Sequence, residues 1–448
     1  MSQTRRCRAA RSAIAWLCVS WLFLSHPPQA VRAFPTAVAT SVAADDQVRA
    51  QQNPRRPLRP DAAVTERETS GSLFENVAKL LCAKYYDEGF RSEQLPGLAA
   101  RYAERAARAS TLGEQRQVVH EFLSQIPASH LGLLSRQSFR FLMYDLFGLA
   151  YPTFGVQVVT LDGECYALYV FEGGPAWRAG VRTWDRIVSI DGVPAPQSSR
   201  VDWRTDDAYL PDDRDPPVHY LTAAPGDTVR VILERRPGRF EHVTLRAEEY
   251  SAFEAAKASA RVLTRRGRTV GYLHFWCIHA TGVPALLREK LDGQFRTCDG
   301  IILDLRGRGG SGAAVAQILQ VLRADGSRRH RPVVALVDRQ SRSAKDVLAY
   351  ELKATGLARI VGERTAGAVM PATFADVGHE SILMFPRTRL PRYSDLLELK
   401  PVEPDLFVER AGPFSAGNDP ILDAGLADLF RAATRSAAGA GSPQKAKL

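Results

Sequence analysis

Strand-like runs alternate with helix-like stretches between Arg268 and Phe430, and this alternation limits the fold more than any other feature of the sequence. The runs are short, apolar and rich in β-branched residues, whereas the stretches between them carry apolar residues at helical spacing. Strands separated by helices are typical of crossover connections in a largely parallel sheet. We therefore expect an α/β core over residues 262–436. Its strand candidates are residues 269–276, 300–307, 332–338 and 358–364, and its clearest helix candidates are residues 313–324 and 343–354.

Two further folded segments precede this core. Residues 71–151 carry apolar side chains at helical spacing, and Thr111 with Glu114 forms a capping-box pattern, so we predict a small helical cap domain. Residues 152–250 contain short strand-like runs between turns, which predicts a β domain.

The first 33 residues are built like a secretory signal peptide. Arginines precede the 13-residue apolar segment Ala13–Ser25, and a small-residue cleavage pattern follows at residues 31–33. A bilayer span needs about 20 apolar residues. We therefore predict export to the periplasm or cell envelope, with a membrane tether if the segment is not cleaved. We expect a flexible linker over residues 34–70 and a disordered tail over residues 437–448.

The formal net charge of +10 does not by itself indicate a nucleic-acid partner. Five of the 59 basic residues lie in the predicted signal peptide, and the others are interleaved with 49 acidic residues, without a basic stripe that carries aromatics. We therefore predict no nucleic-acid binding. The four cysteines beyond the signal peptide are widely spaced and have no metal-ligand spacing with histidine, so we predict no metal site and no cofactor.

Two loops at predicted strand ends carry the candidate chemistry. The first, "LDLRGRGGSG" at residues 303–312, lacks the lysine of a phosphate-binding Walker loop, but its glycine N–H groups could stabilise an oxyanion. The second, "VDRQSRSAKD" at residues 337–346, places Ser343 directly before a helix. A serine there gains from the helix dipole as a nucleophile, although serine is also a common helix cap.

The glycine-rich stretch "GGPAWRAGVRTWDRIVSIDG" at residues 173–192 resembles the corresponding stretch of PDZ domains. The resemblance implies that a peptide C-terminus binds along Phe154, Gly155, Val156 and Gln157 and adds to the sheet edge. A polar insertion over residues 196–226 departs from a compact PDZ domain, and a PDZ domain without a peptide ligand remains the alternative.

Taken in order, the segments and motifs resemble the C-terminal processing (tail-specific) serine peptidases over residues 73–430. The resemblance implies a multidomain α+β protein with a helical cap, a PDZ-like β domain and a crotonase-like α/β peptidase core. It rests on the cap, the PDZ-like domain and four motifs, namely "LDLRGRGG", "SRSAKD", "VGERTAGA" and "VEPDLFV".

By position, the resemblance implies that Ser343 is the nucleophile. The oxyanion donors would be the N–H groups of Ala344 and of Gly310, with Gly309 as the alternative to Gly310. The family uses a lysine base 25 positions after the serine, where this chain has Ala368. Lys345 lies close to Ser343 in sequence but does not match that position, and we expect it to point elsewhere.

The tricorn-like branch of the family also lacks the lysine and uses a histidine and a glutamate. The resemblance to this branch implies that His274 is the general base and that Glu398 orients it, with His130 and His279 in reserve.

The leading hypothesis is therefore an exported serine endopeptidase that acts on proteins or peptides through their C-termini. An inactive homologue that binds peptides or ligands, or serves as a scaffold, is the first alternative. An adaptor that works through the PDZ-like domain alone is the second. The sequence does not specify the oligomeric state.

Overall fold

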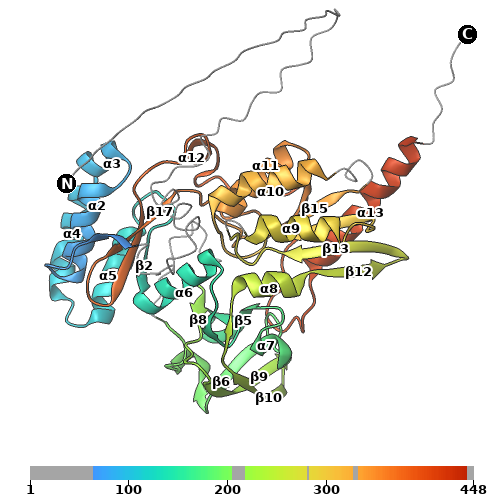
Figure 1. Cartoon of the computed structure of the whole chain (residues 1–448). Helices are drawn as coiled ribbons and strands as arrows, with labels where there is room; N and C mark the ends of the chain where they lie inside the picture. Colours follow the sequence, from blue (N-terminus) through green and yellow to red (C-terminus); the bar gives the residue numbers. More distant parts are fainter. Residues whose placement is uncertain (1–63, 204–216, 280–281, 326–330, 441–448) are drawn as a thin grey trace, which may run out of the picture. The chain divides into compact units, whose positions relative to one another are not determined.

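The computed structural model describes residues 64–203, 217–279, 282–325 and 331–440, which form a mixed α/β fold (Figure 1). The predicted signal peptide lies outside the described residues, as do residues 34–63 of the predicted linker and residues 441–448 of the predicted tail. No helix within the described residues is long and apolar enough to cross a membrane.

A six-stranded sheet forms the C-terminal core, in the order β12-β13-β14-β15-β16-β19. Its strands are parallel except for the first, β12, which pairs antiparallel with β13. The predicted crossovers are present, because helices connect the four longer parallel strands. The strands are β12 (Arg261–Arg265), β13 (Arg268–His274), β14 (Gly300–Asp304), β15 (Val333–Val337), β16 (Arg359–Gly362) and β19 (Leu406–Phe407).

Helices bury both faces of this sheet, which explains why its strands are apolar throughout. Alternate side chains of a strand point to opposite faces, so Ile301 and Leu303 pack with three helices while Ile302 packs with the C-terminal one. The three helices lie together along one side of the sheet in Figure 1. They are α9 (Gly282–Asp292), α10 (Gly312–Ala324) and α11 (Ala344–Ala354), and the C-terminal helix is α13 (Pro420–Ala440).

The N-terminal segment is helical as expected, but it also contributes strands to a second sheet, ordered β1-β17-β18-β2. Apolar residues of its helices share one buried cluster with Leu383 and Phe385 of β18. The structure thus differs from the sequence analysis, because β1 lies within the expected linker and β2, β17 and β18 were not foreseen. The elements are β1 (Val64–Arg67), α2 (Leu73–Lys84), α3 (Glu88–Glu93), α4 (Leu95–Arg108), α5 (Leu112–Leu123), β2 (Gly132–Ser135), α6 (Arg136–Phe147), β17 (Ala372–Asp376) and β18 (Ser381–Pro386).

The middle segment forms a sheet of order β10-β9-β6-β5-β4-β8, with the short helix α7 (Pro175–Arg178). A separate pair, β3 (Tyr151–Thr153) and β11 (Glu248–Tyr250), closes the segment, and α8 (Ala252–Ser259) leads into the core. The strands of the main sheet are β4 (Val156–Leu161), β5 (Glu164–Val170), β6 (Arg186–Ile190), β8 (His219–Tyr220), β9 (Thr228–Arg236) and β10 (Arg239–Arg246).

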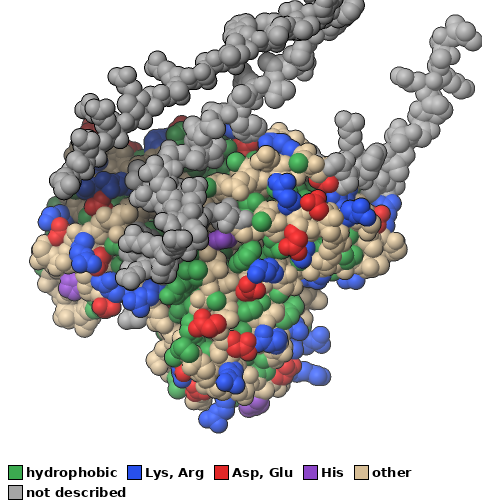
Figure 2. Space-filling model, in the orientation of Figure 1, with side chains coloured by type: hydrophobic (Ala, Val, Ile, Leu, Met, Phe, Trp, Pro, Cys, Tyr) green, Lys and Arg blue, Asp and Glu red, His purple; other side chains and the backbone are tan. Residues whose placement is uncertain are grey.

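Charged side chains of both signs are interspersed on the described part of the face shown in Figure 2. The four described cysteines, Cys82, Cys165, Cys277 and Cys298, are free thiols.

Candidate active site

The loops that leave the carboxyl ends of β13, β14 and β15 meet at one edge of the core sheet. Ligand sites of open α/β sheets lie at this edge. Two main-chain hydrogen bonds join the loop after β14 to the loop after β13. Ile278 N–H donates to the Gly309 carbonyl at 3.1 Å, and Ser311 N–H donates to the Ile278 carbonyl at 2.7 Å. Gly310 has φ 149°, and a Cβ there would lie 2.5 Å from Ile278 N, so this close approach requires glycine.

Ser343 occupies the turn between β15 and α11 in a strained backbone conformation. Its φ of 59° and ψ of −120° lie in a region that non-glycine residues rarely adopt. The strain is held by the Ser343 N–H, which donates to the Ala368 carbonyl at 2.8 Å and to Asp346 Oδ2 at 3.0 Å. The side chain is only half-buried. This combination is typical of a nucleophile presented on a sharp strand-to-helix turn.

The glycine loop lies directly against this serine. A Cβ built on Gly309 would lie 3.2 Å from Ser343 Cβ and 3.8 Å from Ser343 Oγ. Within the described part of the chain, no hydrogen bond uses the main-chain N–H of Gly309, Gly310 or Ala344. The sequence-predicted oxyanion donors and nucleophile are therefore brought together, and the donors are available.

Side chains of the loop after β15 hold this loop against the glycine loop after β14. Gly307 N–H donates to Asp338 Oδ1 at 3.0 Å, and Ser341 Oγ donates to the Leu305 carbonyl at 2.8 Å. Asp338 and Ser341 are themselves joined at 3.0 Å. These buried contacts hold the glycine loop in place before any substrate arrives.

The turn with Ala368 lies on the other side of Ser343. Asp346 accepts from Gly367 N–H at 2.9 Å and from Ala368 N–H at 3.0 Å, and burial raises the pKa of Asp346 to about 6. Ala368 thus contacts the serine turn directly. It presents a buried methyl group there.

Glu398 follows α12 (Tyr393–Leu397) and joins this turn to the N-terminal segment. Its carboxylate accepts from Val369 N–H at 3.0 Å and Met370 N–H at 3.1 Å. It also accepts from Ser129 N–H at 2.6 Å and from Ser129 Oγ at 3.0 Å. Glu398 therefore lies beside the turn that contains Ala368, whose carbonyl accepts from Ser343 N–H.

His130 comes next in this chain of hydrogen bonds. Its Nδ1 lies 3.0 Å from Ser129 Oγ. Because Ser129 Oγ donates its hydrogen to Glu398, it can only accept from His130, which assigns the proton to Nδ1. Nε2 is then free to accept a proton, and the described residues provide no partner for it.

The backbone and the charge state of His130 also suit a base. Its φ of 57° is again unusual for a residue with a side chain. Burial, and to a smaller extent the charge of Arg342, holds the pKa of His130 well below its ordinary value, so the imidazole is neutral near pH 7.

His274 lies in a different environment from the one that the sequence analysis expected. Its Nε2 contacts the Arg306 carbonyl at 3.3 Å, its Nδ1 lies 3.7 Å from Glu172 Oε1, and its ring stands 4.0 Å from that of Trp276. No contact among the described residues joins it to Ser343 or Glu398. The second reserve, His279, uses Nδ1 to accept from Gly282 N–H. Within the described residues, Glu398 is therefore joined through Ser129 to His130, named only as a reserve, and not to His274.

The expected peptide-binding edge is already covered. Gln157 and Val158 of β4 pair with Tyr220 and His219 of β8, and Phe154 and Val156 are buried. The edge of β4 is covered because the insertion at residues 196–226 returns along it as the additional strand β8. A peptide can therefore not add to the sheet at Gln157 while β8 is in place.

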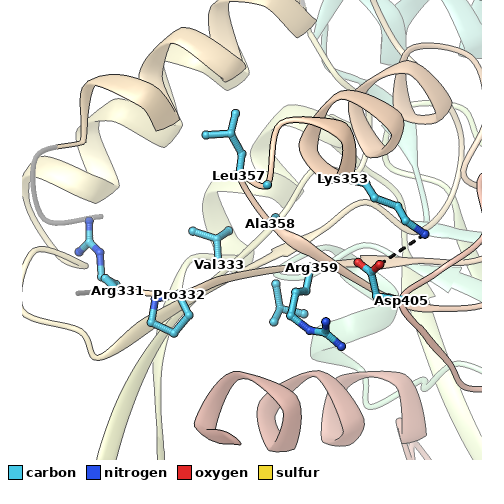
Figure 3. A pocket seen from close by; sticks show the side chains of 10 residues that line it. Arg331, Pro332, Val333, Lys353, Leu357, Ala358, Arg359 and Asp405 are labelled. Carbon is cyan, nitrogen blue, oxygen red and sulfur yellow. Dashed lines mark ion pairs between the residues drawn. The ribbon is translucent and has the colours of Figure 1, made fainter. Parts of the chain in front are cut away.

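Two cavities have different relations to the serine. A small one, of about 60 Å³, borders the glycine loop between α6, β5 and β8, and Asp145 lines it. Burial raises the pKa of Asp145 to about 7. A larger one, of about 380 Å³, lies at the amino ends of β15 and β16 (Figure 3). Ser343 follows the carboxyl end of β15, so this cavity is at the opposite edge of the sheet. It contains the Lys353–Asp405 ion pair at 3.4 Å. No cluster of potential metal ligands occurs among the described residues.

A family model described as "Peptidase family S41" matches residues 320–408, a stretch that contains Ser343, Ala368 and Glu398. This match supports assignment to the S41 peptidases. A chloroplastic C-terminal processing peptidase of Tetradesmus obliquus is 25% identical over 358 residues, covering 72% of this chain and 73% of the relative. The carboxyl-terminal-processing protease of Synechocystis is 23% identical, covering 74% and 79%.

A further relative, the carboxy-terminal processing protease CtpB of Bacillus subtilis, is 23% identical over 61% of this chain and 58% of its own. Among solved structures, a photosystem II D1 C-terminal processing protease has a TM-score of 0.44 at 18% identity and covers 75% of this chain and 92% of its own. The tricorn protease has a TM-score of 0.46 at 18% identity, with 81% and 36% covered.

Ser129 is the site residue that sequence reasoning missed. The Ser-His pair after α5 was visible as a polar pair in a loop, but nothing local to it indicates a partner 269 residues away. The S41 match begins at residue 320, so it does not reach this pair either.

Proposed function

We propose that the chain is an exported serine endopeptidase of the C-terminal processing type, with Ser343 as the nucleophile. His130 would act as the general base, and Glu398 would orient it through Ser129. One observation carries the proposal: the strained Ser343 lies between main-chain N–H groups that no described residue accepts from and the turn held by Glu398. The S41 relatives support the reaction class.

The proposed reaction begins when His130 Nε2 takes the proton of Ser343 Oγ and Oγ attacks the scissile carbonyl carbon. The developing negative charge on the carbonyl oxygen is stabilised by the N–H groups of Ala344 and Gly310, with Gly309 as the alternative donor. His130 then gives its proton to the leaving amide nitrogen, and the C–N bond breaks. An acyl group remains on Ser343.

Water completes the reaction at the same site. His130 takes a proton from a water molecule that attacks the acyl carbonyl, and the proton returns to Ser343 Oγ as the acyl product leaves. The Ser129 hydroxyl transmits the orienting effect, because it accepts from His130 Nδ1–H and donates to Glu398. The neutral state of buried His130 suits its role as proton acceptor.

We also propose that the PDZ-like domain over residues 152–250 binds substrate C-termini along Phe154–Gln157. Since β8 pairs with Gln157, this binding requires β8 to leave the edge. Peptides with a free C-terminal carboxylate would then bind more tightly than their amides. Equal affinity for acid and amide would refute this part of the proposal.

The main test compares wild type with Ser343→Ala. We expect the purified protein to cleave a loosely folded protein substrate and to be labelled by a fluorophosphonate, and we expect Ser343→Ala to do neither. An unlabelled, inert wild type that still binds peptides would instead establish the inactive binding homologue. The methyl group of Ala368 in place of a lysine is the observation that favours this second candidate.

A further inference from the structure

Lys345 is a fully buried lysine one helical residue beyond the proposed oxyanion donor Ala344. It is among the largest completely buried side chains of the described residues. Burying an ammonium group is costly unless its hydrogens find acceptors. The acceptors of the Lys345 ammonium group therefore explain how this side chain can be buried.

The Lys345 ammonium group contacts the main chain of the segments that lead into Ile278 and into the glycine loop. Its Nζ donates to the Arg306 carbonyl at 2.8 Å and to the Trp276 carbonyl at 3.2 Å. Among the described residues these two carbonyls are its hydrogen-bond partners, and no carboxylate forms an ion pair with it. No hydrogen bond among the described residues joins Lys345 to Ser343, so its contacts are those of an anchor between main-chain segments.

The two carbonyls belong to the two segments that build the oxyanion site. Trp276 precedes Ile278, and Arg306 precedes Gly309 and Gly310. Farther along, the same segments are joined through the Ile278 and Gly309–Ser311 main chains. One ammonium group thus connects both segments to α11, the helix that begins with the nucleophile.

We propose that Lys345 is a positioning residue that holds the oxyanion loop at a fixed distance from Ser343. This inference rests on the proposed function, because it assigns the loop a role in stabilising the transition state. Three consecutive residues then act in the attack on the scissile carbonyl. Ser343 is the nucleophile, Ala344 donates its N–H to the oxyanion, and Lys345 holds the glycine loop that supplies the second N–H donor.

The charge state of Lys345 provides an independent readout. Burial lowers the pKa of Lys345 to about 8, opposed by Cys277, Asp338 and Asp304 and reinforced by Arg306. The His274 ring also reaches the Arg306 carbonyl, at 3.3 Å. Above pH 8 the anchor becomes a neutral amine that holds the two carbonyls more weakly. We therefore expect kcat of wild type to fall severalfold between pH 8 and pH 9.5.

The decisive experiment compares Lys345→Met with Lys353→Met, the same substitution near the other end of α11. Lys353 is half-exposed, and its Nζ contacts the Glu403 carbonyl and Asp405. We expect Lys345→Met to lower kcat by about 10- to 100-fold, the scale of a misplaced oxyanion donor, with KM little changed. Lys353→Met should match wild type. In Lys345→Met, the affinity for a peptide boronate should fall together with kcat. The pH profile of kcat of Lys345→Met should lack the decrease expected for wild type above pH 8.

The outcomes separate the two levels of the argument. A wild type without fluorophosphonate labelling at Ser343 would refute the proposed function and this inference with it. A labelled wild type together with a fully active Lys345→Met, or with a loss confined to KM, would refute only the role of Lys345. If Lys345→Met does not fold, the wild-type pH profile of kcat decides together with an NMR titration of Lys345, and a kcat that stays constant through the pH at which Lys345 loses its proton would overturn the inference.

Discussion

Ser129 and Glu398 are 269 residues apart in sequence, yet two hydrogen bonds join them, from Ser129 N–H at 2.6 Å and from Ser129 Oγ at 3.0 Å. The first residue belongs to the N-terminal helical segment and the second to the C-terminal core. The proposed base, His130, is therefore supplied by one segment and oriented by the other. Under the proposed function, this contact makes the chemistry at Ser343 depend on an intact N-terminal segment.

Substitution of Ser343 should separate strain from chemistry. Ser343→Ala and Ser343→Gly should both abolish cleavage, but glycine adopts a φ of 59° at no steric cost. We expect Ser343→Gly to unfold at a higher temperature than Ser343→Ala, by the equivalent of about 1 kcal/mol. Thermal unfolding measures this difference. As a control, Ser251→Ala removes the cap of α8 and should keep full activity.

The two candidate histidines give opposite predictions. His130→Gln should lower kcat by about 1,000-fold or more, as expected for loss of a general base in a serine triad. His274→Gln should leave kcat within about tenfold, because its ring contacts Arg306 and Glu172 instead of the serine turn. A larger loss in His274→Gln than in His130→Gln would return His274 to the role that the sequence analysis gave it.

The pH profile should also report on His130. A base must be deprotonated to act, and the pKa of His130 is held well below its ordinary value. The acid limb of kcat/KM should consequently lie below about pH 6.5, the ordinary pKa of histidine. An acid limb above that pH would contradict the assignment of His130 as a buried neutral base.

Glu398→Gln should impair both activity and stability. The carboxylate accepts four hydrogen bonds, and an amide NH₂ group would face at least one N–H donor in its place. A buried unpaired donor costs about 1–3 kcal/mol, which urea unfolding detects. Glu403→Gln is the matched control, because its ion pair with Arg364 is exposed and contributes little. If both variants keep the activity and the free energy of unfolding of wild type, Glu398 has no role in the proposed site.

The sequence predicted the parts of the site that local pattern encodes. Apolar runs followed by glycine, or by serine and a helix, placed Gly309, Gly310 and Ser343 at strand ends, and the sheet brings them together. The partner of Glu398 could not be predicted, because Ser129 reaches it only through the sheet of β1, β17, β18 and β2. That sheet depends on pairing between segments that are far apart in sequence, and β8 covers the edge of β4 for the same reason.

Two glycines of one loop should respond differently to alanine. At Gly310 the φ of 149° and a Cβ contact of 2.5 Å to Ile278 N exclude a side chain, so Gly310→Ala should displace the loop and abolish cleavage. At Gly312 a Cβ meets open space at the start of α10, and alanine favours a helix, so Gly312→Ala should be active and equally or more stable. Activity assays and thermal unfolding of the pair test this. Full activity of Gly310→Ala would show that the loop does not need its close approach to Ile278.

Stability against pH should reveal the buried charge of Lys345 independently of catalysis. Its pKa is about 8 in the folded protein, below the value of about 10.4 in an unfolded chain. Between these values the unfolded state binds more protons, so the free energy of unfolding of wild type should rise with pH relative to that of Lys345→Met. The expected gain approaches about 1.4 kcal/mol per pH unit. Urea unfolding at pH 7.5, 8.5 and 9.5 measures it, and a difference between the two proteins that does not change with pH would mean that Lys345 keeps an ordinary pKa in the fold.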